Sequence, residues 1–360
     1  MNKKTLEKIK EFLKDGNFDS ALKIARKESK GKEDELTTIF IDLGVKESEK
    51  VKLENYKLAY LFFKLAEEIA KNDELKKIAI ENQAKTRYNA GVLLTELGRY
   101  EEAEKKYREA IQIDSNLLNA HANLGILLAK QKGREKEAEK EFREAIRINP
   151  KSADAHSNLG VLLKNQERYE EAEGEYQEAI QINPDFAPAH NNFGTLLLYF
   201  KRYEEAEKEF QEAIRINPKY ADPHSNIGNL LKDLGRCDEA EKKYLEAIQI
   251  DHNFGKAHYN LGNLLRDLKR YEEAEKEFRE AIRTDSNDVY AHSNLGNLLR
   301  YLGRYEEAEK EYREALRINP NLAEAHNNLG LLLSDLKRYE EAEKEYREAL
   351  RINPNLAEAH

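Results

Sequence analysis

The chain has 360 residues, of which 36% are charged and 40% hydrophobic, and its formal net charge at pH 7 is -9. This acidic balance lacks the general basic signature of a nucleic-acid-binding protein. The single cysteine, Cys237, excludes a disulfide framework, and no apolar run is long enough for a signal peptide or a membrane span. We therefore expect a cytoplasmic protein without nucleic-acid or membrane partners.

Residues 1–83 have helical periodicity but no regular repeat. The segment Asp15-Gly16-Asn17 separates two short apolar patterns, and Tyr56, Ala59 and Phe63 resemble the later repeats with a longer connection. We interpret residues 1–83 as an irregular N-terminal cap that contains two degenerate helix pairs, because the terminal repeats of an array are atypical. From Asn72 to about Leu97 nothing breaks the pattern, which predicts one long helix.

From residue 84 a glycine returns every 34 residues, with one step of 35. The eight glycines are Gly91, Gly125, Gly160, Gly194, Gly228, Gly262, Gly296 and Gly330. We number each repeat so that this glycine is position 8; eight repeats then cover residues 84–356, and residues 357–360 begin a ninth. A period of this length is typical of a solenoid of stacked repeats.

Each repeat contains two helical halves. In the sixth repeat the apolar positions of the first half are Ala257, Leu261, Leu264, Leu265 and Leu268, and those of the second are Tyr271, Ala274, Phe278, Ala281 and Ile282. A glycine inside a helix costs roughly 1 kcal/mol relative to alanine, so we expect position 8 to permit close helix packing. Aromatic rings at positions 17 and 24 are expected to fill the space between helix pairs, with Cys237 as a small buried replacement at position 17.

The seventh repeat shows which family the chain resembles. Its matching residues are Leu295, Gly296, Leu299, Gly303, Tyr305, Ala308, Tyr312, Ala315 and Pro320. This pattern resembles that of tetratricopeptide-repeat (TPR) proteins, strongly from residue 84 onward and loosely before it. The resemblance implies an all-α, right-handed superhelical solenoid of stacked antiparallel helix pairs. One departure is position 4, which is histidine in seven of the eight repeats.

The titratable side chains do not predict catalysis. A histidine that recurs once per repeat lies on the order of 10 Å or more from its next copy, too far for the ligands of one metal ion. We expect half-buried histidine rings at the helix contact, and a solvated acidic face with pairs such as Glu275–Arg279 on the second helices. No phosphate loop, zinc pattern or nucleophile elbow is present, so we predict no enzyme activity, cofactor or metal.

Position 6 is asparagine in all eight repeats, beginning with Asn89. Asparagine is a mediocre helix former, so helix propensity does not explain this pattern. Positions 2, 6, 9 and 13 share a stripe that points away from the apolar one, and an amide can pair with a peptide backbone of any sequence. Repeats five to seven add an asparagine at position 9 and a cation at position 12. The predicted peptide-binding residues are Asn123, Asn158, Asn192, Asn226, Asn229, Asn260, Asn263, Asn294, Asn297, Asn328, Lys164, Lys232, Arg266 and Arg300.

Two alternatives remain for this asparagine ladder: the amides solvate a concave helix face, or they contact the first helix of the adjacent repeat. Amides for the backbone and cations for carboxylates suit an extended, acidic peptide. TPR proteins of this type bind peptides in a concave groove, and the TPR region of O-linked N-acetylglucosamine transferase carries a similar asparagine ladder. That resemblance implies that the ladder contacts a peptide backbone.

We therefore predict a non-catalytic protein-interaction scaffold that binds an extended peptide. The alternatives are the substrate-recruiting arm of a larger enzyme, such as a glycosyltransferase whose catalytic domain follows residue 360, and a self-assembly module. Residues 338–360 repeat residues 304–326 letter for letter. We expect Tyr339, Ala342 and Tyr346 to be partly uncovered there, so that more chain or a second molecule covers this end.

Overall fold

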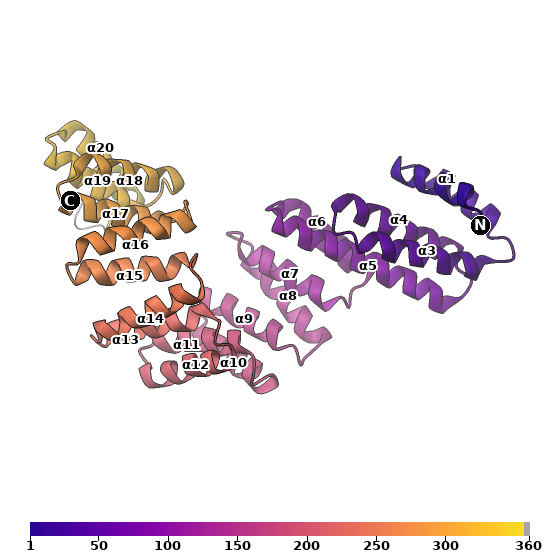
Figure 1. Ribbon diagram of the computed structural model, residues 1–360, viewed down its shortest axis with the longest axis horizontal. Coiled ribbons are helices and arrows are strands. Elements are labelled where there is room, and N and C mark those ends of the chain that lie inside the picture. Colours follow the sequence, from indigo (N-terminus) through magenta and orange to yellow (C-terminus); the bar gives the residue numbers. More distant parts are fainter. Residues whose placement is uncertain (356–360) are drawn as a thin grey trace. The chain divides into compact units, whose positions relative to one another are not determined.

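The computed structural model describes residues 1–355, which form twenty α-helices and no strand. The predicted start of a ninth repeat at residues 357–360 lies outside this range. By its internal contacts the chain divides into two bodies, Met1–Pro184 and Asp185–His360. In each body the helices form antiparallel pairs, and successive pairs stack on one another (Figure 1). The expected all-α solenoid of stacked helix pairs is therefore confirmed.

The N-terminal body, residues 1–184, contains ten helices. They are α1 (Lys3–Lys14), α2 (Phe18–Glu28), α3 (Glu33–Ser48), α4 (Leu53–Ile69), α5 (Asp73–Glu96), α6 (Tyr100–Ile113), α7 (Leu118–Ala129), α8 (Glu135–Ile148), α9 (Ala153–Asn165) and α10 (Tyr169–Ile182). The long helix expected from Asn72 is α5, and the Asn72 side chain caps its first turn by accepting from the backbone N–H groups of Glu74 and Leu75. The division into a cap and regular repeats remains a prediction.

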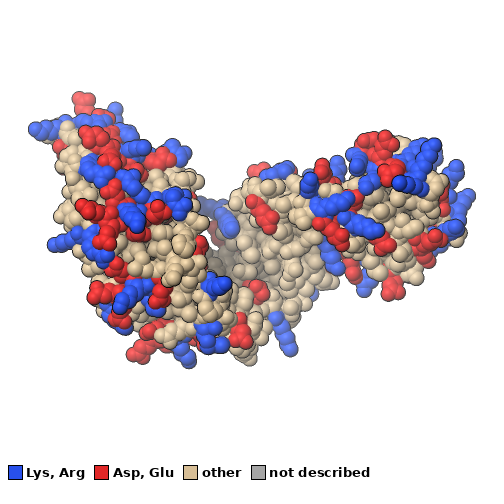
Figure 2. Space-filling view, in the orientation of Figure 1, with Lys and Arg blue, Asp and Glu red and all other residues tan. Residues whose placement is uncertain are grey.

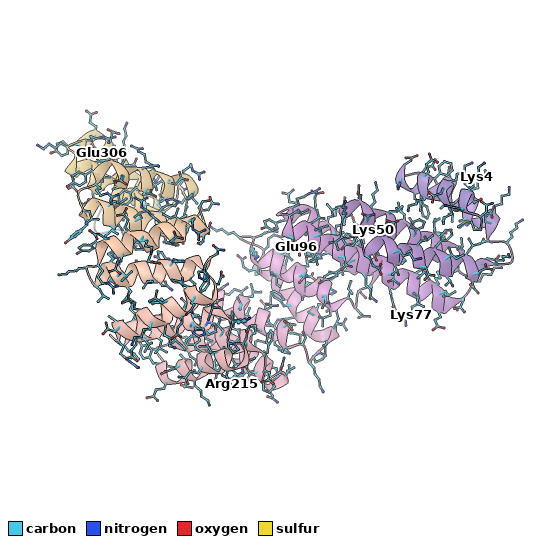
Figure 3. The ribbon with its side chains drawn as sticks, in the orientation of Figure 1. Lys4, Lys50, Lys77, Glu96, Arg215 and Glu306 are labelled. Atoms are coloured by element: carbon cyan, nitrogen blue, oxygen red, sulfur yellow. The ribbon has the colours of Figure 1, made fainter. Side chains whose placement is uncertain are left out.

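The C-terminal body begins at residue 185 and contains the other ten helices. They are α11 (Ala187–Tyr199), α12 (Tyr203–Ile216), α13 (Ala221–Asp233), α14 (Cys237–Ile250), α15 (Gly255–Asp267), α16 (Tyr271–Thr284), α17 (Val289–Tyr301), α18 (Tyr305–Ile318), α19 (Ala323–Asp335) and α20 (Tyr339–Ile352). Side chains fill the space between neighbouring helices (Figure 3). Two of the labelled residues, Arg215 and Glu306, lie on α12 and α18.

The aromatic ring at position 24 packs against the position-8 glycine of its own repeat. A Cβ atom on Gly262 would lie 2.8 Å from Cδ1 of Phe278, and one on Gly228 would lie 2.5 Å from Cε1 of Tyr244. The prediction that this glycine permits close helix packing is confirmed. Our expectation for the ring was wrong in one respect: the position-24 ring packs within its own helix pair, because the glycine leaves its space there.

Two other sequence expectations need correction. Leu268 at position 14, which we assigned to the apolar stripe, is 38% exposed, since it caps the first helix and lies in the turn. At the last pair, Tyr339 is 64% exposed as expected. Ala342 is only 3% exposed, because its small side chain is covered by the packing of α19 and α20 on each other. Cys237 is half-buried at the start of α14.

Six of the position-4 histidines pair with a glutamate of the following helix. In each, Nδ1 lies 2.6 Å from a carboxylate oxygen, as for His258 and Glu277 or His292 and Glu311. The rings are buried or nearly so, which confirms their position at the helix contact. His224 differs because Lys243 replaces the glutamate; it lies 3.1 Å from Glu246 instead.

An arginine at position 16 joins successive second helices. In five repeats its Nη1 donates to a glutamate of the preceding second helix at 2.6–2.7 Å, as Arg304 does to Glu275. The same arginine also pairs with the glutamate three residues later. Figure 2 shows cations and carboxylates interspersed over the face that it draws.

Candidate functional site

The candidate peptide-binding face is built by the first helices of the repeats. In the N-terminal body α5 contacts α7, and α7 contacts α9; in the C-terminal body α11, α13, α15, α17 and α19 form a continuous row of such contacts. Within each body, a second helix packs against the first helix of the next repeat, as α14 does with α15. This arrangement brings the position-6 asparagines of successive repeats onto adjacent helices.

At four repeats the position-6 amide donates to position 5 of the preceding repeat. Asn226 Nδ2 donates to Asn191 Oδ1 at 2.9 Å, and Asn260 Nδ2 donates to Ser225 Oγ at 3.3 Å. The other two are Asn123 to Tyr88 Oη at 3.1 Å and Asn294 to Tyr259 Oη at 2.9 Å. One of our two alternatives, contact with the adjacent first helix, therefore describes these four amides.

The position-9 asparagines belong to the same network. Asn294 also donates to Asn263 Oδ1 at 3.0 Å, and Asn297 Oδ1 accepts from the hydroxyl of Tyr312 at 2.7 Å. Asn229 Oδ1 accepts from Tyr244 at 2.8 Å in the same way. Two of the rings that pack on the position-8 glycines, those of Tyr244 and Tyr312, thus carry hydroxyl groups that reach the ladder. Burial raises the pKa of both hydroxyls, so they remain donors.

Part of the ladder keeps hydrogen-bonding capacity. Asn158 and Asn328 are half-buried, and within residues 1–355 their amides make no hydrogen bond. The Oδ1 atoms of Asn123 and Asn260 likewise accept none from the described residues. Asn192 and Lys164 are half-buried on the same stripe. In contrast Asn226 is 3% exposed, and Lys256 Nζ lies 3.5 Å from its Oδ1.

The position-12 cations of repeats five to seven are paired with carboxylates. Lys232 Nζ lies 2.9 Å from Asp267 Oδ2, Arg266 Nη2 lies 3.0 Å from Asp267 Oδ1, and Arg300 Nε lies 2.8 Å from Asp335 Oδ2. Partial burial raises the pKa of Asp267, but Lys232 and Arg266 outweigh it, so that the pKa lies below its usual value. A carboxylate of a ligand would therefore compete with one the protein already supplies.

Sequence reasoning missed the position-5 residues as partners of the ladder. A signal was present, because position 5 is polar in seven of the eight repeats: Tyr88, Ser157, Asn191, Ser225, Tyr259, Ser293 and Asn327. Position 5 of one repeat and position 6 of the next lie 35 residues apart. Only the stacking of the first helices shows that these two positions are neighbours.

In the described part of the chain, no three His, Cys, Asp or Glu side chains are grouped so that they could hold a metal ion. No helix within residues 1–355 combines the length and the apolar character that a membrane crossing requires.

Sequence profiles of known families match most of the chain. Profiles described as TPR repeat match residues 91–132, 130–167, 197–235 and 296–337. Three further profiles are described as tetratricopeptide repeat. One matches residues 153–186 and 323–356, the second matches 219–287, and the third matches 175–208 and 277–310. The chain belongs to the tetratricopeptide-repeat family. A comparison of this TPR sequence with curated proteins finds no significant match.

Two solved structures support the same fold. A structure in the APC/C hetero-tetramer Cut9–Hcn1 matches with a TM-score of 0.60 at 17% identity, over 97% of this TPR chain and 72% of that chain. PilF of Pseudomonas aeruginosa matches with a TM-score of 0.51 at 22% identity, over 58% of this chain and 96% of its own. At such identities the likeness concerns the fold alone. The likeness to the ladder of O-linked N-acetylglucosamine transferase remains a prediction.

Proposed function

We propose that this TPR protein is a non-catalytic scaffold that binds an extended peptide segment along the first helices of the C-terminal body. The observation that supports this role is the unused hydrogen-bonding capacity of two ladder asparagines on that face. The Oδ1 atom of Asn260 and the whole amide of Asn328 lack partners among the described residues. An extended peptide exposes N–H and C=O groups that such amides satisfy regardless of side chain.

The other ladder amides then have a supporting role. Asn226 and Asn294 hold adjacent first helices together, so they fix the spacing of the amides that meet the ligand. Lys232, Arg266 and Arg300 are 31–32% exposed. An acidic ligand residue would gain from them by replacing Asp267 or Asp335, so acidic character adds selectivity and backbone pairing supplies most of the affinity.

The test begins with peptides selected from a random 12-residue display library against the whole chain, followed by calorimetry on the selected peptides. Replacing Asn260 and Asn328 together by alanine should weaken binding about 30-fold, because each lost hydrogen bond contributes ~1 kcal/mol. Methylating individual peptide nitrogens should weaken binding at the positions that face these amides, because each methyl group removes a donor.

Asn287→Ala with Asn321→Ala is the matched control, because both asparagines are exposed in the same body and lie in turns between repeats, away from the ladder. This variant should bind the peptides within about twofold of the unchanged chain, a difference of a few tenths of a kcal/mol. If Asn260→Ala with Asn328→Ala binds the peptides as tightly as the unchanged chain, or if methylation of the peptide backbone has no effect, the ladder does not contact the ligand.

A further inference from the structure

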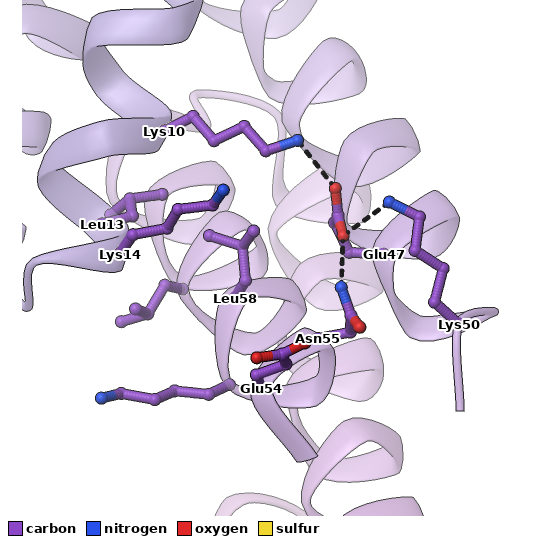
Figure 4. Close-up of a pocket in the computed structure, with 10 residues that line it drawn as sticks. Lys10, Leu13, Lys14, Glu47, Lys50, Glu54, Asn55 and Leu58 are labelled. Atoms are coloured by element: carbon purple, nitrogen blue, oxygen red, sulfur yellow. Dashed lines mark hydrogen bonds and ion pairs between the residues drawn. The ribbon is translucent and has the colours of Figure 1, made fainter. Parts of the chain in front are cut away.

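Residues of α4 line two cavities in the N-terminal body. One, of ≈ 450 Å³, lies between α1, the end of α3 and α4 (Figure 4). The other, of ≈ 420 Å³, lies between α4, α5 and α6. Lys57 and Leu61 of α4 line both cavities, so the two adjoin along that helix. Each has a volume typical of ligand-binding clefts.

Basic residues outnumber acidic ones in the lining of these cavities, and apolar residues also contribute to it. Seven of the lining side chains are lysine or arginine and only three are glutamate, although the whole chain has a net charge of -9. Leu13 and Leu58 contribute to the apolar part of the first cavity, and Ala90 and Leu94 to that of the second. We call this combined surface the α4 groove.

A buried carboxylate organises the first cavity. Glu47, whose side chain is 6% exposed, accepts from Lys10 and Lys50 at 2.9 Å and from Asn55 at 2.8 Å (Figure 4). Three donors from different elements thereby hold α1, α3 and α4 together. Lys14 and Lys57 are exposed, and neither has an ion-pair partner among residues 1–355. These two ammonium groups are therefore available to a ligand.

The second cavity lacks a carboxylate that the later repeats possess. Arg99 has position 16 of the first repeat, and its Nε and Nη2 bind Glu102 at 2.7 and 2.8 Å. In five later repeats the remaining Nη1 of this arginine binds a glutamate three residues before the aromatic ring that packs on glycine, as Arg134 binds Glu104. Within the described chain, Nη1 of Arg99 has no such acceptor.

Tyr60 stands where that glutamate would be. The ring of Phe63 packs against Gly44 as the position-24 rings pack against their glycines, and Tyr60 precedes Phe63 by three residues. Its ring instead lies under the guanidinium of Arg87, at 3.6 Å from the ring centroid. No ion pair connects α4 with α6 among the described residues. The groove is thus open where later repeats close it with a carboxylate.

We propose that the α4 groove binds an acidic, amphipathic helical segment of a partner protein. A carboxylate of that segment takes the place of the absent glutamate at Nη1 of Arg99, others meet Lys14 and Lys57, and its apolar side chains enter the two cavities. Charge complementarity selects this occupant, since a purely apolar segment leaves Lys14 and Lys57 unpaired and a small anion leaves the apolar lining residues uncovered. This surface is separate from the asparagine ladder.

The probe is a fluorescein-labelled 16-residue peptide with leucine at helical spacing and glutamate at the other positions, measured by fluorescence anisotropy with the full chain. Saturable binding is expected. Lys14→Glu with Lys57→Glu should weaken it at least tenfold. Tyr60→Glu should also weaken it at least tenfold, because the new carboxylate supplies Arg99 with the acceptor found in later repeats.

Lys27→Glu with Lys76→Glu is the matched control, because both lysines are exposed in the same body and the charge change is identical. This variant should bind the peptide within twofold of the unchanged chain. Circular dichroism checks that each variant remains helical. Equal weakening by both lysine pairs, equal binding of a peptide with serine in place of leucine, or no saturable binding would each overturn the proposal.

Discussion

A contact between one glycine and one aromatic ring recurs in every repeat and determines how closely its two helices pack. The ring at position 24 occupies the space that a Cβ atom at position 8 would need; at Gly296, for example, that atom would lie 2.8 Å from Cε1 of the buried Tyr312. Buried rings of this size cannot move without displacing their neighbours. The helical penalty of glycine is therefore offset by packing.

Gly262→Ala should lower stability, although alanine is the better helix former. Its Cβ would lie 2.8 Å from the fully buried ring of Phe278, and overpacking costs ~1–3 kcal/mol, which exceeds the propensity gain of ~1 kcal/mol. The midpoint of urea unfolding should fall. Gly174→Ala is the control: a Cβ there meets nothing within 4 Å, so stability should rise by ~0.5–1 kcal/mol. A rise for both variants would contradict the packing argument.

A left-handed backbone conformation recurs at the ends of the first helices. After the first helix the backbone turns through a left-handed residue, which is Gly235 or Gly303 in some repeats but Glu167, Lys201, Lys269 or Lys337 in others. A side chain with a Cβ atom is strained in that conformation. These four helix ends consequently store strain that the glycine-containing repeats avoid.

Lys269→Gly should raise stability, because φ at this residue is 63° and glycine removes a strain of ~1 kcal/mol. The reverse change, Gly303→Lys, imposes a side chain at φ 74° and should destabilise by a similar amount. Urea unfolding of the two variants measures both effects. If their midpoints move in the same direction, the strain at this turn does not control helix ending.

Across the whole molecule, the histidine–glutamate pairs link stability to pH. Both nitrogens of His121, His156, His258, His292 and His326 face acceptors, a carboxylate at 2.6 Å and a backbone carbonyl at 3.0–3.3 Å. Only the doubly protonated ring donates from both nitrogens. At His258 burial lowers the pKa, but Glu277 and the His252 carbonyl outweigh it, so the pKa is raised. The pKa values of the other four are raised as well.

Stability should therefore fall as the pH rises above the unfolded histidine pKa of about 6.5. A histidine whose folded pKa exceeds its unfolded value of about 6.5 stabilises fully below that value, and the contribution is lost as pH rises through the folded pKa. The urea midpoint measured across this range should decrease with pH. Phe40 and Phe62 have the equivalent positions in the pair of α3 and α4, where their ring centroids lie 6.2 Å apart. Replacing both His258 and Glu277 by phenylalanine should therefore reduce the fall of the urea midpoint with pH. A midpoint that rises with pH would contradict the linkage.

Residues that follow the repeat period were predictable one by one, whereas residues that meet across repeats were not. Gly262 and Phe278 carry clear local signals, and they lie on the two helices of one predicted pair, α15 and α16. Asn294 and Tyr259 do not, because their contact depends on how two first helices stack. The pairing of Arg300 with Asp335, and the absence of an acceptor for Arg99 Nη1, depend in the same way on neighbouring helices.

The sequence by itself determined the all-α repeat architecture, since a 34-residue period of glycine, alanine and aromatic residues can bury its apolar stripes only by stacking. Only the tertiary structure decided which amides and cations are already paired, and where α4 leaves a basic groove open. The physical reason is that helix formation and apolar packing depend on spacing along the chain, whereas a hydrogen bond or ion pair depends on atoms brought within about 3 Å by packing.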